Sequence, residues 1–149
     1  MIHVETSVTI DRPAEEVFSV LSDLERQPDW VSSIQESEIT SGGPVREGTT
    51  FRQVVKALGR RMETEATVTE YDPPRAFAFE GGAGPMRMTF RFTVSPEGTG
   101  SRIDQVVEGE TKGFFKLADS IAARTMKKQF EADLATLKAV LESRSAATV

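Results

Sequence analysis

Residues 114–143 read FFKLADSIAARTMKKQFEADLATLKAVLES and contain neither glycine nor proline. The stretch is rich in alanine, leucine, lysine, glutamate and glutamine, which have high helix propensities. It therefore predicts one long C-terminal helix, about 45 Å in length at a rise of about 1.5 Å per residue.

The polar and apolar residues of this predicted helix lie on opposite sides when they are placed at steps of about 100°. The solvent stripe comprises Lys116, Arg124, Lys127, Glu131, Lys138 and Glu142. The apolar side comprises Phe114, Leu117, Ala118, Ile121 and Ala122 in the first half and Phe130, Leu134, Leu137 and Leu141 in the second. Because the centre of the apolar side drifts between the halves, we expect a bend or two packing partners along one helix.

Upstream of the helix, apolar residues recur with period two, which is typical of half-buried strands. Residues 1–10 predict a first strand, after which Asp11, as a cap, and the early Pro13 predict a helix start. A second short helical piece opens at Asp29 and Trp30. Further strands are expected at residues 34–41, 49–58, 61–71, 75–81, 86–95 and 101–110. Short turns join them, so the strands predict an antiparallel meander.

The widths of these elements decide the fold class. Six to seven strands at about 4.8 Å spacing form a sheet about 30 Å across, whereas a helix with its side chains is about 10–12 Å wide. One helix cannot cover such a sheet unless the sheet curls around it. We therefore predict an α+β fold in which a curved antiparallel sheet wraps around a long C-terminal helix, with two short helices after the first strand. Such a fold tends to enclose a cavity, which is unfavourable unless ligand or water fills it.

Composition narrows the functional classes. The 149 residues favour one domain, residues 1–149, with residues 144–149 expected to be frayed. A net charge of −5 argues against nucleic acid as a partner. The absence of cysteine and the single histidine exclude thiolate catalysis, cysteine-based zinc sites and sites that need two histidines. Residues 1–10 do not resemble a signal peptide, and no stretch is apolar enough to span a membrane, so we expect a cytoplasmic protein.

The short motifs in the chain point to structure more than to chemistry. The glycine-rich residues 81–84 lack the lysine and helix of a phosphate-binding loop and predict a hairpin end. Glu63 and Glu65 are paired at strand spacing, and we expect both on the solvent face. His3 is expected at the surface, without the partners of a catalytic triad.

Five stretches of the chain together carry a family resemblance: VTIDRPAEEVF at 8–18, PDW at 28–30, VTEYDPPR at 68–75, EGETKG at 108–113 and FEADLATLK at 130–138. With these stretches, the chain resembles the helix-grip fold of the SRPBCC superfamily, and in particular its polyketide cyclase/dehydrase and lipid-transport branch. The resemblance implies that a hydrophobic or amphipathic small molecule binds between the sheet and the long helix. Because enzymes of this superfamily share no catalytic motif, it assigns no catalytic residue.

Candidate ligand-binding residues are those of inward parity. The apolar candidates are Trp30, Phe51, Val55, Phe77, Phe79, Met88, Phe90, Phe114 and Ile121. The polar candidates are Gln53, Gln105, Thr125 and Gln129, with Asp133 at the margin of the helix stripe. A few oriented polar groups in a mostly apolar pocket are the usual design of a small-molecule site. The alternatives are a packing role for Trp30 and internal hydrogen bonds for the polar residues.

We therefore expect a module that binds a polyketide, lipid or isoprenoid, needs no cofactor or metal, and is a monomer or a homodimer. A polyketide cyclase/aromatase or dehydratase is the alternative, although the lack of histidine, cysteine and tyrosine at cavity positions favours binding. A third possibility is a protein that acts through its surface. A cavity lined by Gln53, Gln105, Gln129 or Asp133 would support the first two, whereas an interior filled by phenylalanine would argue against them.

Overall fold

The computed structural model describes residues 2–57, 59–82, 87–110 and 116–144. The elements in chain order are β1 (Ile2–Ile10), α1 (Ala14–Leu21), the 3-10 helix η1 (Leu24–Asp29), β2 (Ile34–Ile39), β3 (Thr50–Ala57), β4 (Arg60–Asp72), β5 (Ala76–Gly82), β6 (Arg87–Glu97), β7 (Gly100–Glu110) and α2 (Lys116–Glu142). The predicted α+β class, with two short helices after the first strand and one long C-terminal helix, is confirmed. The predicted start of the second short helix at Asp29 and Trp30 is wrong, because η1 ends at Asp29 and Trp30 is its C-cap residue. Among these residues, no helix is both long and apolar enough to cross a membrane.

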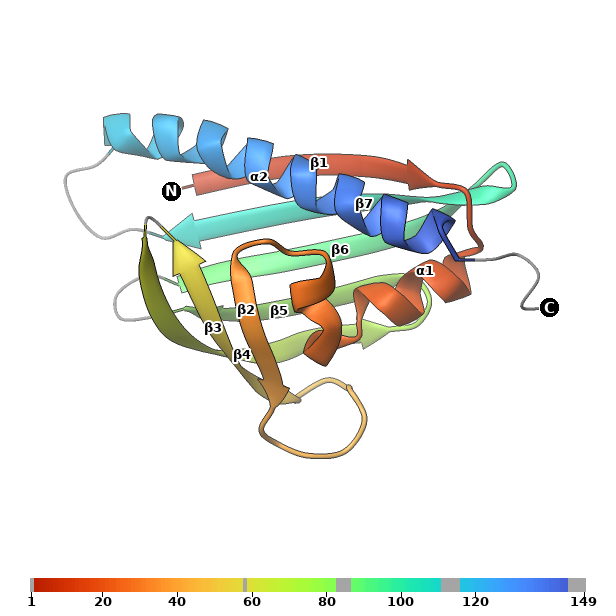
Figure 1. Ribbon diagram of the computed structural model, residues 1–149, viewed down its shortest axis with the longest axis horizontal. Coiled ribbons are helices and arrows are strands. Elements are labelled where there is room, and N and C mark those ends of the chain that lie inside the picture. Colours follow the sequence, from red (N-terminus) through yellow and green to blue (C-terminus); the bar gives the residue numbers. More distant parts are fainter. Residues whose placement is uncertain (1, 58, 83–86, 111–115, 145–149) are drawn as a thin grey trace.

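The strands form one seven-stranded antiparallel sheet in the order β1-β7-β6-β5-β4-β3-β2. Each of β2 to β6 pairs with the next strand in the chain, and β1 pairs with β7. The predicted meander is therefore confirmed. The helices lie on one face of this sheet, which curves around them (Figure 1).

The start of α1 differs from the prediction at Asp11. The N-cap residue is Pro13, in an extended conformation, and no side chain caps the helix. Asp11 lies two residues too early, and its backbone N–H instead donates to Glu142 Oε2 at 2.9 Å. The prediction of an Asp11 cap is therefore wrong, because this residue belongs to a contact with the end of α2.

Helix α2 lies along β1 and packs against two different clusters. Its C-terminal half inserts the fully buried Leu134, Leu137 and Leu141 into the main core beneath α1. Near the middle of the helix, Met126 and Phe130 pack against a second cluster, formed by Ile2, Val4 and Val107. The prediction of two packing partners is confirmed.

Ile121 departs from its predicted inward position, since the side chain is 68% exposed. At about 100° per residue it lies opposite Phe130 and Leu141. Because the C-terminal stripe fixes the rotation of the whole helix, the apolar residues of the first half cannot all face the sheet.

Aromatic side chains fill the interior on the side of α1 and η1. Phe77 is fully buried and stacks on Phe92, with ring centroids 6.4 Å apart. Trp30 meets Phe92 edge to face at 6.3 Å, and Phe18 meets Phe77 at 6.4 Å. Such pairs add to the free energy of burying the rings.

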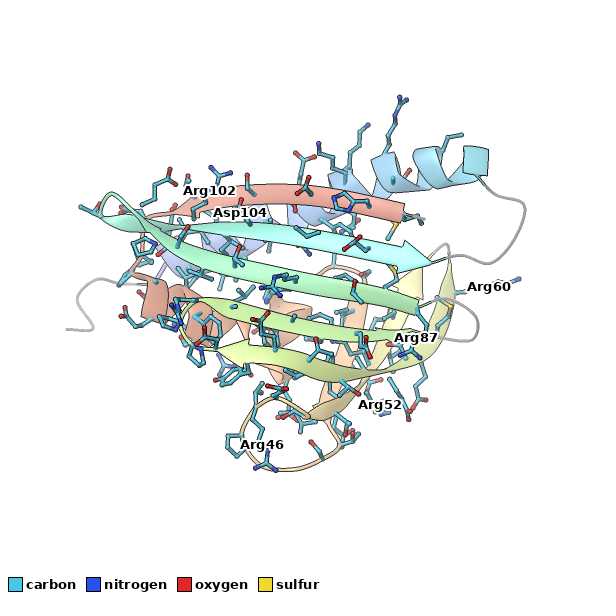
Figure 2. All side chains as sticks on the ribbon, turned by 180° about the vertical axis from the view of Figure 1, so that it is seen from behind. Arg46, Arg52, Arg60, Arg87, Arg102 and Asp104 are labelled. Atoms are coloured by element: carbon cyan, nitrogen blue, oxygen red, sulfur yellow. The ribbon has the colours of Figure 1, made fainter. Side chains whose placement is uncertain are left out.

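The outer face of the sheet carries charged side chains, many of them in cross-strand ion pairs (Figure 2). Arg52 lies 3.3 Å from Glu38 and 3.6 Å from Glu63. The predicted solvent positions of Glu63 and His3 are confirmed, since both are exposed. The His3 imidazole lies 3.5 Å from Glu108, its cross-strand neighbour. Isolated exposed pairs of this kind contribute little to stability.

Candidate functional site

On the strands from β3 to β6, the inner face of the sheet is buried at one end and half-buried at the other. On the side of α1, Phe77, Phe92 and Ile103 are at most 2% exposed. The half-buried residues of the same face, and of the helix above it, are Val55, Met88, Phe90, Met126 and Phe130. We call this region the open end. Large inward-facing apolar side chains that stay half exposed mark a candidate site for an apolar ligand.

At the open end, the inner face of the sheet has no side chain on either side of Met88, because glycines occupy both neighbouring positions. The strand register places Gly81 of β5 and Gly109 of β7 directly beside Met88 of β6. A Cβ at Gly81 would lie within 2.6 Å of Ala66 Cβ, so this position requires glycine. A Cβ at Gly109 would meet Met88 Cγ at 3.4 Å, an ordinary contact. Contacts of a Cβ therefore do not require glycine at position 109, and Gly109 leaves the inner face without a side chain beside Met88.

A row of four phenylalanines crosses the interior from α2 to β3. The ring centroids lie 6.0 Å apart for Phe130 and Phe90, 5.0 Å for Phe90 and Phe79, and 5.3 Å for Phe79 and Phe51. Phe51 and Phe79 are buried, whereas Phe90 and Phe130 are half-buried. This row separates the sealed core from the open end and supplies the apolar wall of the candidate site.

The polar group nearest to this wall on α2 is Asp133. It is 4% exposed, and its Oδ1 accepts hydrogen bonds from Gln129 Nε2 at 2.9 Å and from the Ser32 backbone N–H at 3.3 Å. Burial raises the pKa of the Asp133 carboxyl above its ordinary value, and these hydrogen bonds oppose the shift. The cluster joins α2 to the segment between η1 and β2.

The other predicted polar residues are also paired inside the protein. Gln105, 4% exposed, accepts a hydrogen bond from Thr6 Oγ1 at 3.1 Å. Gln53 donates from Nε2 to Gln27 Oε1 at 2.6 Å and to Ser37 Oγ at 3.2 Å. Both glutamines lie on the inner face, as their parity predicts, and each already has a hydrogen-bond partner.

The structure brings together most, but not all, of the predicted site residues. Those that share the interior are Phe51, Gln53, Val55, Phe77, Phe79, Met88, Phe90, Gln105 and Gln129. Thr125 is exposed, and its hydroxyl donates to the Ile121 carbonyl at 3.2 Å, so neither residue reaches the interior. Phe114 lies outside the described residues.

Trp30 lies on the opposite side of the core from the open end. It lines a hollow of about 340 Å³ between α1, η1 and the end of α2, together with Val20 and Val140. Its buried Nε1 has no hydrogen-bond partner among the described residues. A second hollow, of about 400 Å³, is lined by Glu5, Asp104, Lys127 and neighbouring residues outside β1. Neither hollow is lined by Gln53, Gln105, Gln129 or Asp133 within the described parts of the chain, so neither of them is the cavity predicted from the sequence.

Sequence reasoning missed Thr6 and Ser32 as neighbours of the site. Thr6 lies on the inward parity of β1 between Val4 and Val8, so the period-two pattern could have identified it. Ser32 lies between η1 and β2, where no period applies. Its contact with Asp133 depends on tertiary packing alone.

A long helix gripped by a seven-stranded antiparallel sheet defines the helix-grip class. The chain matches the family described as "Polyketide cyclase / dehydrase and lipid transport" over residues 1–142. It therefore belongs to this family, and the resemblance drawn from its sequence is confirmed. Two uncharacterized proteins of Mycobacterium tuberculosis, from strains CDC 1551 / Oshkosh and H37Rv, are each 27% identical to it over 135 residues, or 90% of this chain and 94% of theirs.

Solved structures share the fold. The protein TTHA0849 from Thermus thermophilus superposes with a TM-score of 0.77 at 22% identity, covering 97% of this chain and 99% of that one. The ZhuI aromatase/cyclase from Streptomyces sp. R1128 also has a TM-score of 0.77, at 20% identity, covering 97% and 96% of the two chains.

Proposed function

We propose that the protein binds a hydrophobic or amphipathic small molecule of the polyketide, lipid or isoprenoid type at the open end. The observation that carries the proposal is the contrast in burial along β6, where Met88 and Phe90 stay half-buried while Phe92 and Val94 are buried. A ligand above Met88 would cover this apolar surface, at about 25 cal/mol per Å² removed from water.

The chemistry of the surroundings fits such a ligand. The wall is aromatic and aliphatic, and Met88 and Met126 have flexible side chains that adapt to varied shapes. Gln129 and Asp133 offer polar contacts at one side. The membership of the family favours the same class of ligand.

A filling substitution tests the location. Leucine at position 109 has room for its Cβ and would project into the space beside Met88. We expect Gly109→Leu to fold normally and to lower the affinity for anilinonaphthalene sulfonate at least tenfold, and to lose any apolar ligand detected by native mass spectrometry. The matched control is Val106→Leu, which enlarges a half-buried residue of the same strand at opposite parity. Equal affinity of both variants and the wild type would contradict the proposed location.

A catalytic role as a polyketide cyclase/aromatase or dehydratase is the second candidate. It is favoured by one observation, the buried Asp133 carboxyl, whose pKa is raised in the way that general acids require. Under this proposal Asp133 exchanges a proton with a bound poly-β-carbonyl chain. Turnover of such a substrate by the wild type and its loss in Asp133→Asn, with affinity unchanged, would support catalysis. If both proteins bind the substrate and neither turns it over, the result supports the binding function and contradicts the catalytic one.

The single domain, the cytoplasmic location, the independence from cofactors and the monomeric or homodimeric state remain predictions from the sequence.

A further inference from the structure

The open end also carries an unusual combination of exposed side chains. Met62 and Ile121 are large hydrophobic residues of the described chain that are 43% and 68% exposed. Met62 lies near the β3–β4 turn, and Ile121 lies in the first turns of α2. Both segments lie at the same end of the molecule (Figure 1). One exposed apolar side chain needs no explanation, but two at one end of a molecule identify a surface.

Basic residues lie on the segments that carry these two side chains and on the neighbouring strand β6. The set, which we call the basic rim, comprises Lys56, Arg60, Arg61, Arg87, Arg124 and Lys128, and all six are exposed. Lys127 instead lines the hollow outside β1. Arg60 and Arg87 project at this end in Figure 2. Glu36 pairs with Arg61 at 3.5 Å and Glu80 pairs with Arg87 at 3.6 Å. The other four make no ion pair with another described residue. The chain as a whole carries a charge of −5, and these six residues are a third of its 18 lysines and arginines.

The first turns of α2 unite both kinds of side chain on one face. Ile121 points away from the core, and Arg124 and Lys128 follow it at helical spacings of three and seven residues. An apolar residue between cations on the outer side of a helix is the pattern of a segment that lies in a membrane interface.

We propose that the open end docks reversibly on an anionic lipid surface, with the basic rim on the headgroups and Ile121 and Met62 inserted between them. The charge of the basic rim complements such a surface and would orient the otherwise acidic protein toward it. An acidic protein would satisfy the cations but gives no reason for the two exposed apolar side chains. The inference does not require a ligand to be bound.

Vesicle flotation tests the proposal with the full chain. We expect the wild type to bind phosphatidylcholine vesicles that contain about one-third phosphatidylglycerol, to ignore pure phosphatidylcholine, and to be released as ionic strength rises. The double variant Arg124→Gln/Lys128→Gln should bind about 25-fold more weakly, at about fivefold for each charge. The matched control, Arg46→Gln/Arg75→Gln, removes two exposed charges away from the open end and should bind as the wild type does.

The variant Ile121→Gln tests whether apolar insertion into lipid contributes to vesicle binding in addition to the attraction between charges. Because the residue is 68% exposed, the variant should fold normally, which circular dichroism checks, yet bind anionic vesicles about tenfold more weakly. Three results would overturn the proposal. The first is that the wild type does not bind anionic vesicles at low ionic strength. The second is that the control variant Arg46→Gln/Arg75→Gln loses as much vesicle affinity as Arg124→Gln/Lys128→Gln. The third is that Ile121→Gln changes neither the affinity for poly-glutamate nor the affinity for vesicles. Any of them is distinguishable from failure of ligand binding, because no soluble ligand enters the assay.

Discussion

At the scale of single residues, Asp133 shows how one side chain links the helix to the rest of the site. Its Oδ1 accepts from the Ser32 backbone N–H, the Ser32 hydroxyl and Gln129 Nε2. An asparagine could keep all three bonds through its own Oδ1, whereas a leucine could keep none. These two substitutions therefore separate what the hydrogen-bond acceptor of Asp133 contributes to stability from what its charge contributes.

We predict that Asp133→Asn is as stable as the wild type at neutral pH, or more stable. Asp133→Leu should be less stable by about 1–3 kcal/mol, because the partly buried hydrogen bonds from Ser32 and Gln129 lose their acceptor. A carboxyl whose pKa is raised on folding favours the folded state most below its unfolded pKa. The wild type should thus lose stability, relative to Asp133→Asn, as pH rises through the folded pKa. Urea unfolding from about pH 3 to 7 measures both effects. Equal destabilisation by Asn and Leu would contradict this account.

Residue parity also shows what a sequence can and cannot predict about the site. Alternation placed Phe51, Phe79, Met88 and Phe90 on the inner face because a strand has only two faces. It could not show that Gln53 and Gln105 would pair with Gln27 and Thr6, since these contacts join segments far apart in the chain.

At the scale of elements, the meander and the two helical regions followed from hydrophobic period and turn residues. The orientation of α2 did not. Its rotation is fixed by Leu134, Leu137 and Leu141, and that constraint turns Ile121 outward. A helix wheel drawn over each half separately contains no information on which half controls the rotation.

The end of α2 is tied to the β1–α1 connection by a group of polar contacts. Glu142 Oε2 accepts from the Asp11 backbone N–H at 2.9 Å and from Lys138 Nζ at 2.7 Å. Arg12 Nη2 donates to the backbone carbonyls of Glu142 and Arg144, at 2.8 and 2.7 Å. Carbonyls at a helix C-terminus lack partners within the helix, so Arg12 completes this end.

These contacts predict a pH-dependent effect of Glu142→Gln. The Asp11 N–H, followed by Lys138, lowers the pKa of the Glu142 carboxyl, so its contribution is present above the unfolded pKa and is lost as pH falls through the folded pKa. We expect the variant to have a lower Tm than the wild type at neutral pH and the same Tm in strong acid. Thermal unfolding across this range is the measurement, with the exposed Glu131→Gln on the same helix as control. A Tm difference that does not change with pH would contradict the assignment.

At the scale of the whole molecule, the fold is built as two unequal halves. Leucines of α2 and the aromatic cluster around Phe77 and Phe92 fill the half beneath α1. In the other half, Gly81 and Gly109 leave the inner face of the sheet without side chains beside Met88. There α2 packs against the smaller cluster around Val107. The sealed half supplies stability, and we assign ligand binding to the open half.

The methionines allow this division to be tested directly. The chain has five, of which Met88 and Met126 lie at the open end beneath and within α2. With carbon-13 methyl labels, assigned from Met88→Leu and Met126→Leu, titration with anilinonaphthalene sulfonate is followed by NMR. We predict that the Met88 and Met126 methyl resonances shift together with one dissociation constant, and that Gly109→Leu weakens both responses. Saturable binding of the probe without a shift of either methyl would contradict a ligand site between the sheet and α2.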